Sequence, residues 1–592
     1  MSSVQRIFKK SEEVITKSPD SFGYIAVGMG VLILLTKLTS LVKSQILIAI
    51  YGIKSVELDL FNAANVIPEF IFSIVVIGGI NAALIPVFNK ITISESEKEQ
   101  KLIFSTIVNI FIFVLLILCS LVFIFTPQIL GSITQLRLPN TDNSLSPADF
   151  ELLVELVRIL IFSQIILCVS SIFSSILQVK KAFWITALAP LFYNIGIIFS
   201  SYILTHFNND IKILAYGVLL ASFLHFIIQL PSIIKTGIQY NPFSFGIKNF
   251  YVVKAIKNTL PRTIGLTSDY MGSIFQSLIA LNLVTGSLNA LRLAISIREL
   301  PASLFGLSIA QSVFPRMSEL AEKGDNEEFQ KIFSQAIRMV LFWTIPVTAI
   351  FIVLRTPISQ LLFGLFQKEG DFEGTNMVAY ALLFLSLSVI FFSVLGIVNR
   401  AFYSLNDSVT PTIVSIIVIF FELTMAYTLV NLFSHFDESL SLNPLYLVSN
   451  IDNYFSNGNS PAALGGIALA STLAVGLNVT ILIFRLRKKG PDFFYEAHYI
   501  YKKFISGILM LLVGFLVFKY TNDFFDTTRV VGVFLTTLNS TFFMLITYYL
   551  SEKLLLDEDI SLLDNILSKG DIYFKKVKGL FNRNKIVSVG TD

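Results

Sequence analysis

The chain has 592 residues, of which 54% are hydrophobic and 55 are phenylalanine, and its formal net charge at pH 7 is +4. Its only two cysteines, Cys119 and Cys168, both lie inside apolar stretches, which argues against a disulfide framework and against a thiolate metal site. The sequence contains no Walker A phosphate loop, paired-histidine metal motif or nucleophile elbow, so it supports neither ATP hydrolysis nor catalysis by a known motif.

About fourteen apolar stretches follow one another along the chain, each long enough to cross the hydrocarbon core of a membrane. They predict an all-α polytopic membrane protein. The third stretch is the clearest, whereas the first, seventh and eighth carry charges. The predicted spans are residues 23–50, 60–88, 102–126, 155–179, 182–205, 214–234, 258–283, 289–315, 335–363, 377–403, 410–433, 462–485, 503–522 and 530–555.

Basic residues alternate between the two sides of these predicted spans. Segments on the side of the N-terminus are rich in lysine and arginine, whereas the opposite loops have few, and the 434–461 loop has none. Because basic loops stay in the cytoplasm, we expect both termini to be cytoplasmic. The net charge of +4 therefore reflects membrane topology, and no nucleic-acid partner is expected. The first span begins about 20 residues in and lacks a small-residue cleavage pattern, so we do not expect a cleaved signal peptide.

Short motifs recur at similar spacing in the two halves of the chain. Ile85-Pro86 followed by Ile103-Phe104-Ser105 matches Phe314-Pro315 followed by Ile332-Phe333-Ser334. Six spans in each half would give both halves the same orientation, as in transporters built from parallel repeats. The domains predicted from this repeat are a cytoplasmic segment at 1–21, an N-lobe of helices 1–6 at 22–234, a C-lobe of helices 7–12 at 235–485, helices 13 and 14 at 486–555, and a basic cytoplasmic tail at 556–592.

Polar and charged residues share helical faces in spans 1, 2, 7 and 8, which are equivalent pairs in the repeat. A charge at mid-bilayer costs about 2.5–3.5 kcal/mol on insertion scales, so such faces usually line a cavity or meet a partner. They indicate a transporter with one central cavity and a charged cargo. Structural ion pairs and side chains snorkelling to the interface are the alternatives, especially for Arg262 and Arg292 near span ends. The faces comprise Lys37, Ser40 and Ser44, with Lys43 nearby; Asn62, Asn65, Glu69 and Ser73; Arg262, Asp269, Ser273 and Gln276; and Arg292, Ser296, Glu299 and Ser303, with Arg298 to one side.

Two prolines interrupt equivalent spans. Pro68 lies in span 2 and Pro301 in span 8, and each removes a backbone hydrogen bond and kinks its helix. Both a hinge and a static packing kink fit this pattern. Glu422, deep in span 11, has no role that the sequence explains.

Three longer segments resemble the MurJ/MviN family of lipid II flippases, within the multidrug/oligosaccharidyl-lipid/polysaccharide exporter superfamily. They are FNAANVIPEFIFSIVVIGGINAALIPVF in span 2, the stretch from TLPRTIGLTSDY to IRELPASLFGLSIAQSVFPRMSELA in spans 7 and 8, and NRAFYSLNDSVTPT. The resemblance covers roughly residues 22–550. It implies two six-helix lobes around a cationic cavity for the pyrophosphate and sugar head group, and a groove at helices 13 and 14 for the lipid tail.

The resemblance also assigns roles to single residues. It places Lys37 and Lys43 where the family has arginines, Asp59 at a family aspartate near the periplasmic gate, and Glu299 at the acid of an ELP motif. Phe72, Ile77 and Ser296 stand where the family has charged residues. The expected substrate-binding residues are Lys37, Lys43, Arg262, Arg292, Arg298 and Glu299; the expected gating or charge partners are Asp59, Glu69 and Asp269; the expected hinges are Pro68 and Pro301; no metal site is expected.

These observations predict a flippase in the cytoplasmic (inner) membrane of a bacterium that moves lipid II to the outer leaflet by alternating access, for cell-wall synthesis. No covalently bound cofactor is expected, and Na⁺, H⁺ or the membrane potential would drive the cycle. Partners would be lipid II or a related undecaprenyl-pyrophosphate-linked glycan, membrane lipids and cell-wall synthesis enzymes. The alternatives are a flippase for another such oligosaccharide, a drug or ion antiporter, a transport-inactive scaffold and, more distantly, a membrane-embedded transferase.

Overall fold

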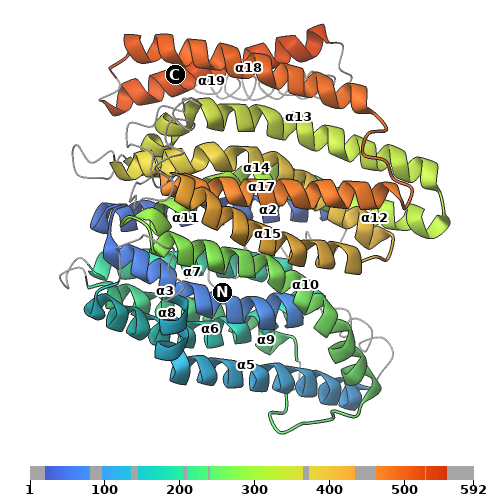
Figure 1. Ribbon diagram of the computed structural model, residues 1–592. Helices are drawn as coiled ribbons and strands as arrows, with labels where there is room; N and C mark the ends of the chain where they lie inside the picture. Colours follow the sequence, from blue (N-terminus) through green and yellow to red (C-terminus); the bar gives the residue numbers. More distant parts are fainter. Residues whose placement is uncertain are drawn as a thin grey trace, which may run out of the picture. The chain divides into compact units, whose positions relative to one another are not determined.

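The computed structural model describes residues 21–80, 96–134, 145–180, 182–204, 210–237, 240–364, 373–433, 462–526 and 529–555 (Figure 1). All regular structure within these ranges is helical, so the predicted all-α class is confirmed. The N-terminal segment before residue 21, the 434–461 loop and the tail after residue 555 lie outside the described residues.

The helices follow one another in two runs and a final pair. The first run is α2 (Ser21–Tyr51), α3 (Val56–Phe72) with the π-helix η1 (Ser73–Ile80), α5 (Glu97–Thr134), α6 (Pro147–Val179), α7 (Phe183–Leu204), α8 (Ile211–Ile227) and the short α9 (Leu230–Lys235). The second is α10 (Phe250–Leu281), α11 (Ser287–Pro301) with the π-helix η2 (Ala302–Leu307), α12 (Ser308–Lys323), α13 (Asn326–Ser359) with the π-helix η3 (Gln360–Gly364), α14 (Glu373–Ser404), α15 (Val409–Phe433) and α17 (Ala463–Arg487). The final pair is α18 (Ala497–Phe524) and α19 (Val530–Leu554).

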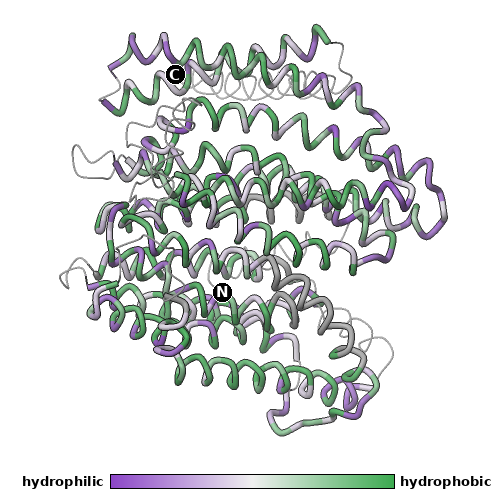
Figure 2. Tube along the Cα trace, in the orientation of Figure 1, coloured by the Kyte–Doolittle hydropathy of each residue, from purple (hydrophilic) through white to green (hydrophobic). Residues whose placement is uncertain are grey.

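Thirteen of the described helices or helix runs are long and apolar enough to span a membrane. The 32-residue α10 adds a shorter apolar stretch at Tyr270–Leu281, in the place of the predicted seventh span. About fourteen spans therefore agree with the expectation from the sequence. Figure 2 shows hydrophobic residues along the helices and hydrophilic residues gathered mainly at helix ends and connections.

Polar caps fix where several helices begin. Ser55 accepts the backbone N–H of Leu58 at the start of α3, and Ser146 accepts that of Asp149 at the start of α6. Asp210, Asn249 and Asp325 cap α8, α10 and α13 in the same way. Each cap satisfies an N–H that the first helical turn leaves without a partner.

The two interrupting prolines have similar local consequences. Pro68 lies near the end of α3, and π-helical backbone follows it as η1; Pro301 ends α11, and η2 begins at the next residue. A proline cannot donate to the carbonyl four residues before it, so the helix widens locally. The kinks expected from the sequence are thus local π-helical segments.

The described residues divide by their contacts into two compact units. Unit 1 comprises Met1–Ala294, Leu362–Ala381 and Ser408–Ala474; unit 2 comprises Ile295–Leu361, Leu382–Asp407 and Val475–Asp592. The division passes through α11, α14 and α17. The lobe boundaries expected from the internal repeat stay a prediction.

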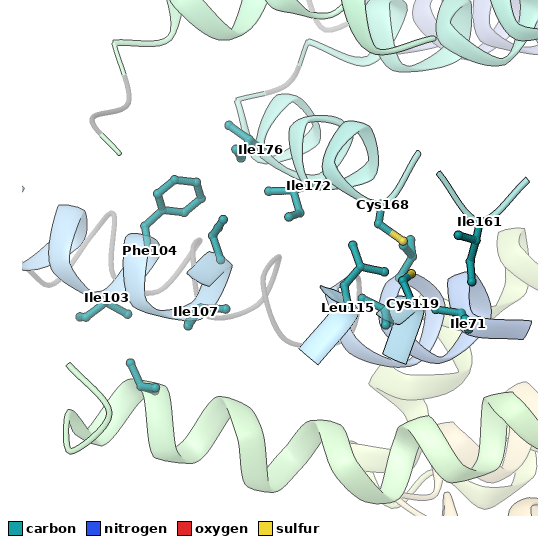
Figure 3. Close-up of a cluster of buried hydrophobic side chains, with 14 residues drawn as sticks. Ile71, Ile103, Phe104, Ile107, Leu115, Cys119, Ile161, Cys168, Ile172 and Ile176 are labelled. Carbon is teal, nitrogen blue, oxygen red and sulfur yellow. The ribbon is translucent and has the colours of Figure 1, made fainter. Parts of the chain in front are cut away.

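Within unit 1, α5 and α6 pack on α3 and η1 around an apolar cluster (Figure 3). Cys119 of α5 and Cys168 of α6 are both free and buried in it. Phe72 packs against the edge of this cluster. A charged residue at that position would lose this apolar contact, which gives Phe72 a packing role where the family resemblance implies an arginine.

Within unit 2, α18 and α19 run side by side and both contact α13 (Figure 1). A fully buried ion pair joins them, with Lys503 Nζ 3.7 Å from Glu552 Oε2. Lys503 also lies 5.0 Å from the centre of the Phe342 ring of α13, and the Tyr548 hydroxyl donates to the Phe342 carbonyl at 3.0 Å. These contacts fix the last two helices on α13.

Candidate functional site

A cluster of charged side chains lies inside unit 1, on α2, α3 and α11. Arg292 Nη2 is 3.5 Å from Glu69 Oε2, and the two side chains are 30% and 49% exposed. Lys43 of α2 lies within electrostatic reach of both. The residue pattern predicts Glu69 and Arg292 on the polar faces of spans 2 and 8 and Lys43 beside the polar face of span 1, and the fold brings the three side chains together. With two cations and one carboxylate, the cluster has a formal charge of +1.

Lys37 lies on α2, six residues before Lys43, which corresponds to about 9 Å along the helix axis. Its side chain is partly exposed, and within the described residues it has no ion-pair partner. The neighbouring turn of α2 is fixed by α7, because Asn194 Nδ2 donates to the Thr36 carbonyl at 3.0 Å and to Thr39 Oγ1 at 3.3 Å. Lys37 therefore supplies a cation without an acid to neutralise it on a helix that is held in place.

Asp59 caps the N-terminus of α11 from another helix. Its Oδ2 accepts the backbone N–H of Gly286 at 2.6 Å, and its Oδ1 accepts that of Asn289 at 2.8 Å. Asn62 Nδ2 adds a 3.3 Å bond to Asn289 Oδ1, and Asn289 Nδ2 donates to the Ile53 carbonyl at 3.2 Å. These charge-assisted bonds to the positive end of the helix dipole join α3 firmly to the start of α11.

Glycine is required where this contact forms. Gly286 has φ +89°, and a Cβ there would lie 2.8 Å from Lys54 Cα and 2.9 Å from the Ile53 carbonyl oxygen. Lys54 also pairs with Glu373 at the start of α14. Asp59 precedes Glu69 by ten residues, about 15 Å along α3. Hydrogen bonds therefore close one end of the group formed by α2, α3 and α11, about 15 Å from Glu69.

Arg298 and Glu299 belong to unit 2. The Arg298 side chain is buried, 8% exposed, and its guanidinium lies 4.3 Å from the centre of the Phe392 ring of α14. Glu299 and Ser296 are exposed on α11. Arg262 and Asp269 lie on α10, but their side chains are outside the described part of the structure. Substrate binding by Arg262, Arg298 and Glu299, and a charge-partner role for Asp269, stay predictions.

A second polar cluster in unit 1 was not predicted as a site. Glu422 of α15 accepts a hydrogen bond from Gln276 Nε2 of α10, which also lies 3.3 Å from Ser471 Oγ of α17. Gly272 leaves room for this carboxylate, because a Cβ there would lie 2.9 Å from Glu422 Oε2. The signal in the sequence was an acid in the middle of an apolar span. Among the described residues, no group of three or more His, Cys, Asp or Glu side chains is arranged to hold a metal.

Comparisons with known proteins agree with this arrangement. A family model described as "Lipid II flippase MurJ" matches residues 49–449. A probable lipid II flippase MurJ of Buchnera aphidicola subsp. Acyrthosiphon pisum is 27% identical over 418 residues, which are 70% of this chain and 80% of that protein. One from Vibrio cholerae is 26% identical over 387 residues, covering 64% and 72%.

Solved structures share the fold. A structure described as "Lipid II flippase MurJ, inward closed conformation" matches with a TM-score of 0.69 at 21% identity, covering 90% of this chain and all of that one. An inward-facing MATE family multidrug transporter of the MOP superfamily matches with a TM-score of 0.56 at 14% identity, covering 76% and 95%. The chain therefore has the fold of a multi-pass membrane transporter.

Proposed function

Because the chain belongs to the lipid II flippase MurJ family, we propose that it carries lipid II from the inner to the outer leaflet of the cytoplasmic membrane by alternating access. The family is one of transporters, and no catalytic step is involved. The observation that carries the proposal is the Lys43–Glu69–Arg292 cluster, which holds two cations within membrane-spanning helices.

The chemistry of this cluster suits a pyrophosphate. Arg292 presents a planar guanidinium for bidentate contacts to phosphate oxygens, and Lys43 adds a point charge. Glu69 holds Arg292 while no substrate is present and competes with the head group when one arrives. That competition keeps the cluster from binding the pyrophosphate too tightly for release. Lys37 would extend the cationic surface along α2.

The contact of Asp59 with the start of α11 serves as a gate in this proposal. While the Gly286 and Asn289 N–H groups are bound, α3 and α11 cannot separate at that end. Opening exposes the Asp59 carboxylate and the first turn of α11 to water, which can satisfy both. The π-helical segments after Pro68 and at Pro301 are where we propose that α3 and α11 bend.

We place both termini in the cytoplasm of a bacterium, because the basic segments lie on that side. The lipid tail would lie against α18 and α19, whose outer faces carry exposed apolar residues such as Leu512, Phe515 and Leu516. The buried Lys503–Glu552 pair keeps those helices on α13 while the tail slides past. Cell-wall synthesis enzymes that make or use lipid II are the expected partners.

A cation gradient or the membrane potential would drive the cycle. Glu422 is our candidate for the coupling group, because its carboxylate lies within a membrane-spanning helix and accepts a hydrogen bond from an amide of a second helix. A carboxylate held in this way can take up Na⁺ or H⁺ from one side and release it to the other. Its side chain is only partly buried by the protein.

The test is to express the chain in bacteria depleted of their own lipid II flippase and to measure lipid II in the outer leaflet with an externally added reagent. Restored exposure, abolished by Lys43→Ala and by Lys37→Ala, is the expected result. Lys331→Ala, which removes a lysine from an exposed pair with Glu327, is the matched control and should retain transport. Good membrane expression without restored exposure would favour another undecaprenyl-pyrophosphate-linked oligosaccharide, which shares the pyrophosphate.

A further inference from the structure

The loop at residues 240–250, between α9 and α10, is tied to α5 by side-chain hydrogen bonds. Asn109 Nδ2 donates to the carbonyl oxygens of Asn241 at 3.1 Å and Ser244 at 2.8 Å. The Tyr240 hydroxyl donates to Asn109 Oδ1 at 2.6 Å. One buried asparagine of a membrane-spanning helix therefore holds three positions of the loop.

Two further contacts bring the loop backbone against α5. Ser105 Oγ accepts the N–H of Asn241, and Thr106 Oγ1 accepts that of Gly246, both at 2.9 Å. A Cβ on Gly246 would lie only 3.2 Å from Leu102 Cδ2, so the backbone approaches the helix closely. The polar groups of the loop thus face α5.

The apolar side chains of the loop are correspondingly exposed. Phe243 is 87% exposed, Phe250 67%, Phe245 57% and Ile247 54%. These residues lie outside the candidate membrane spans. Large apolar side chains that are exposed close together in the sequence, on a backbone tied to a helix, fit a binding site for a membrane or a partner.

The position of the loop along α5 sets its depth. Charged residues occupy the first turns of α5, and Leu102 begins the apolar run. Asn109 lies seven residues further, about 10 Å along the helix axis. The loop therefore contacts the first turns of the apolar run of α5, near one end of this span, and aromatic side chains are enriched at the membrane interface.

The charge around the loop is one-sided. No Asp or Glu occurs between residues 228 and 268, whereas this stretch contains Lys235, Lys248, Lys254, Lys257 and Arg262. Lys235 and Lys248 flank the aromatic residues and are exposed. The closest acids of the helix that holds the loop are Glu97 and Glu99, in the first turn of α5.

We propose that the 240–250 loop is a membrane anchor, which inserts Phe243 and Phe245 among acyl chains while Lys235 and Lys248 bind the phosphate of an anionic phospholipid. The positive charge of the loop and its position near the end of a span fit an anionic phospholipid better than a protein partner. The anchor fixes the connection between the two runs of helices at the membrane surface, and it does not depend on which lipid is transported.

The depth of the loop in the membrane is tested on the full chain in vesicles. Cys119 and Cys168 are replaced by alanine, and a fluorescent bimane label is attached at Phe243→Cys. Quenching by lipids that carry a nitroxide near the head group, with little quenching by aqueous iodide, is the expected result. A label at Lys323→Cys, at the exposed end of α12, is the control and should respond to iodide. Iodide quenching at residue 243 as strong as at residue 323 would overturn insertion.

The lipid preference is tested with spin-labelled phosphatidylglycerol and phosphatidylcholine bound to the same protein. Lys248→Gln should lower the preference for phosphatidylglycerol by up to about fivefold, the effect of one lysine at an anionic surface. Lys488→Gln, an exposed lysine after α17, should change it less. Equal preference for phosphatidylglycerol in wild type and Lys248→Gln would overturn the head-group site. Loss of lipid quenching of the label at residue 243 when a second protein is added would assign the surface to that protein.

Discussion

Three acidic side chains within the spans are held by three different kinds of partner. Asp59 is held by backbone N–H groups, Glu69 by a guanidinium and Glu422 by an amide. A carboxylate in a membrane is costly, so each contact offsets that cost in its own way. Glu69 pairs with a guanidinium, so in our proposal an anionic substrate competes directly with this contact.

Removing the charge of Glu69 should free Arg292. We expect Glu69→Gln to bind lipid II up to about fivefold more tightly, since a partly exposed ion pair contributes roughly 0.2–1 kcal/mol. Transport should slow, because release becomes harder. Binding of fluorescent lipid II and its rate of appearance in the outer leaflet are the two measurements. Glu155→Gln, from the exposed pair with Lys212, is the control, and weaker binding in Glu69→Gln would contradict the competition.

Asp59→Asn should weaken the gate. The asparagine amide keeps one acceptor oxygen but turns its NH₂ group towards a backbone N–H, so one hydrogen bond to α11 is lost. The stabilising free energy of the helix cap then falls by about 1 kcal/mol or more. We expect a cysteine at Asn65 to react faster with a membrane-impermeant thiol reagent added outside. Glu57→Gln, two residues earlier, bonds only to Ser55 and should not change the rate. Unchanged labelling in Asp59→Asn would argue against the gate.

At the scale of elements, the last two helices are attached by buried charge. Lys503 and Glu552 are 0% and 1% exposed, and the Phe342 ring of α13 lies beside the lysine. A buried pair adds little net stability, but removing one partner leaves a charge without compensation. This attachment explains how helices with highly exposed apolar faces keep a fixed place on α13.

We expect Lys503→Met to lower the midpoint of thermal unfolding in detergent, with a loss of about 3–5 kcal/mol. The double variant Lys503→Met/Glu552→Leu should recover most of the loss, because no buried charge is left. Lys502→Met changes the neighbouring, partly exposed lysine and serves as the control. A double variant no more stable than the single one would mean that the pair acts only through its packing.

At the scale of the whole molecule, the cation gradient or membrane potential that we propose as the energy source would act on the protein from both sides of the membrane. The Glu422–Gln276–Ser471 cluster joins α15, α10 and α17, so occupancy of one carboxylate can be sensed by three helices. Glu422 lies in a span that the sequence shows to be otherwise apolar.

If Glu422 binds the coupling cation, Glu422→Gln should transport lipid II at a rate that no longer responds to the gradient. Flipping in vesicles with imposed Na⁺ or pH gradients measures this, and the gradient that accelerates the wild type identifies the ion. The exposed Glu319, paired with Lys323 on α12, offers Glu319→Gln as a control. A gradient response retained in Glu422→Gln would remove this residue from coupling and leave the flippase proposal standing.

Much of the fold and part of the site could be predicted from the sequence. Apolar length predicts the spans, and helical periodicity puts Glu69 and Arg292 on polar faces and Lys43 beside one. Periodicity assigns a face to each residue but no neighbour, so it could not show that Asp59 caps α11 or that Glu422 meets Gln276. Both contacts join residues more than 140 positions apart.

The sequence by itself determined the membrane-spanning helices, their number and the family, because hydrocarbon accepts only long apolar helices whose backbone bonds are internal. Only the tertiary structure decided which embedded charges become partners, because a carboxylate within a membrane takes whatever donor the neighbouring helices bring within about 3 Å. The same holds for the 240–250 loop: its aromatic residues are visible in the sequence, but their exposure follows from Asn109 holding the backbone on α5.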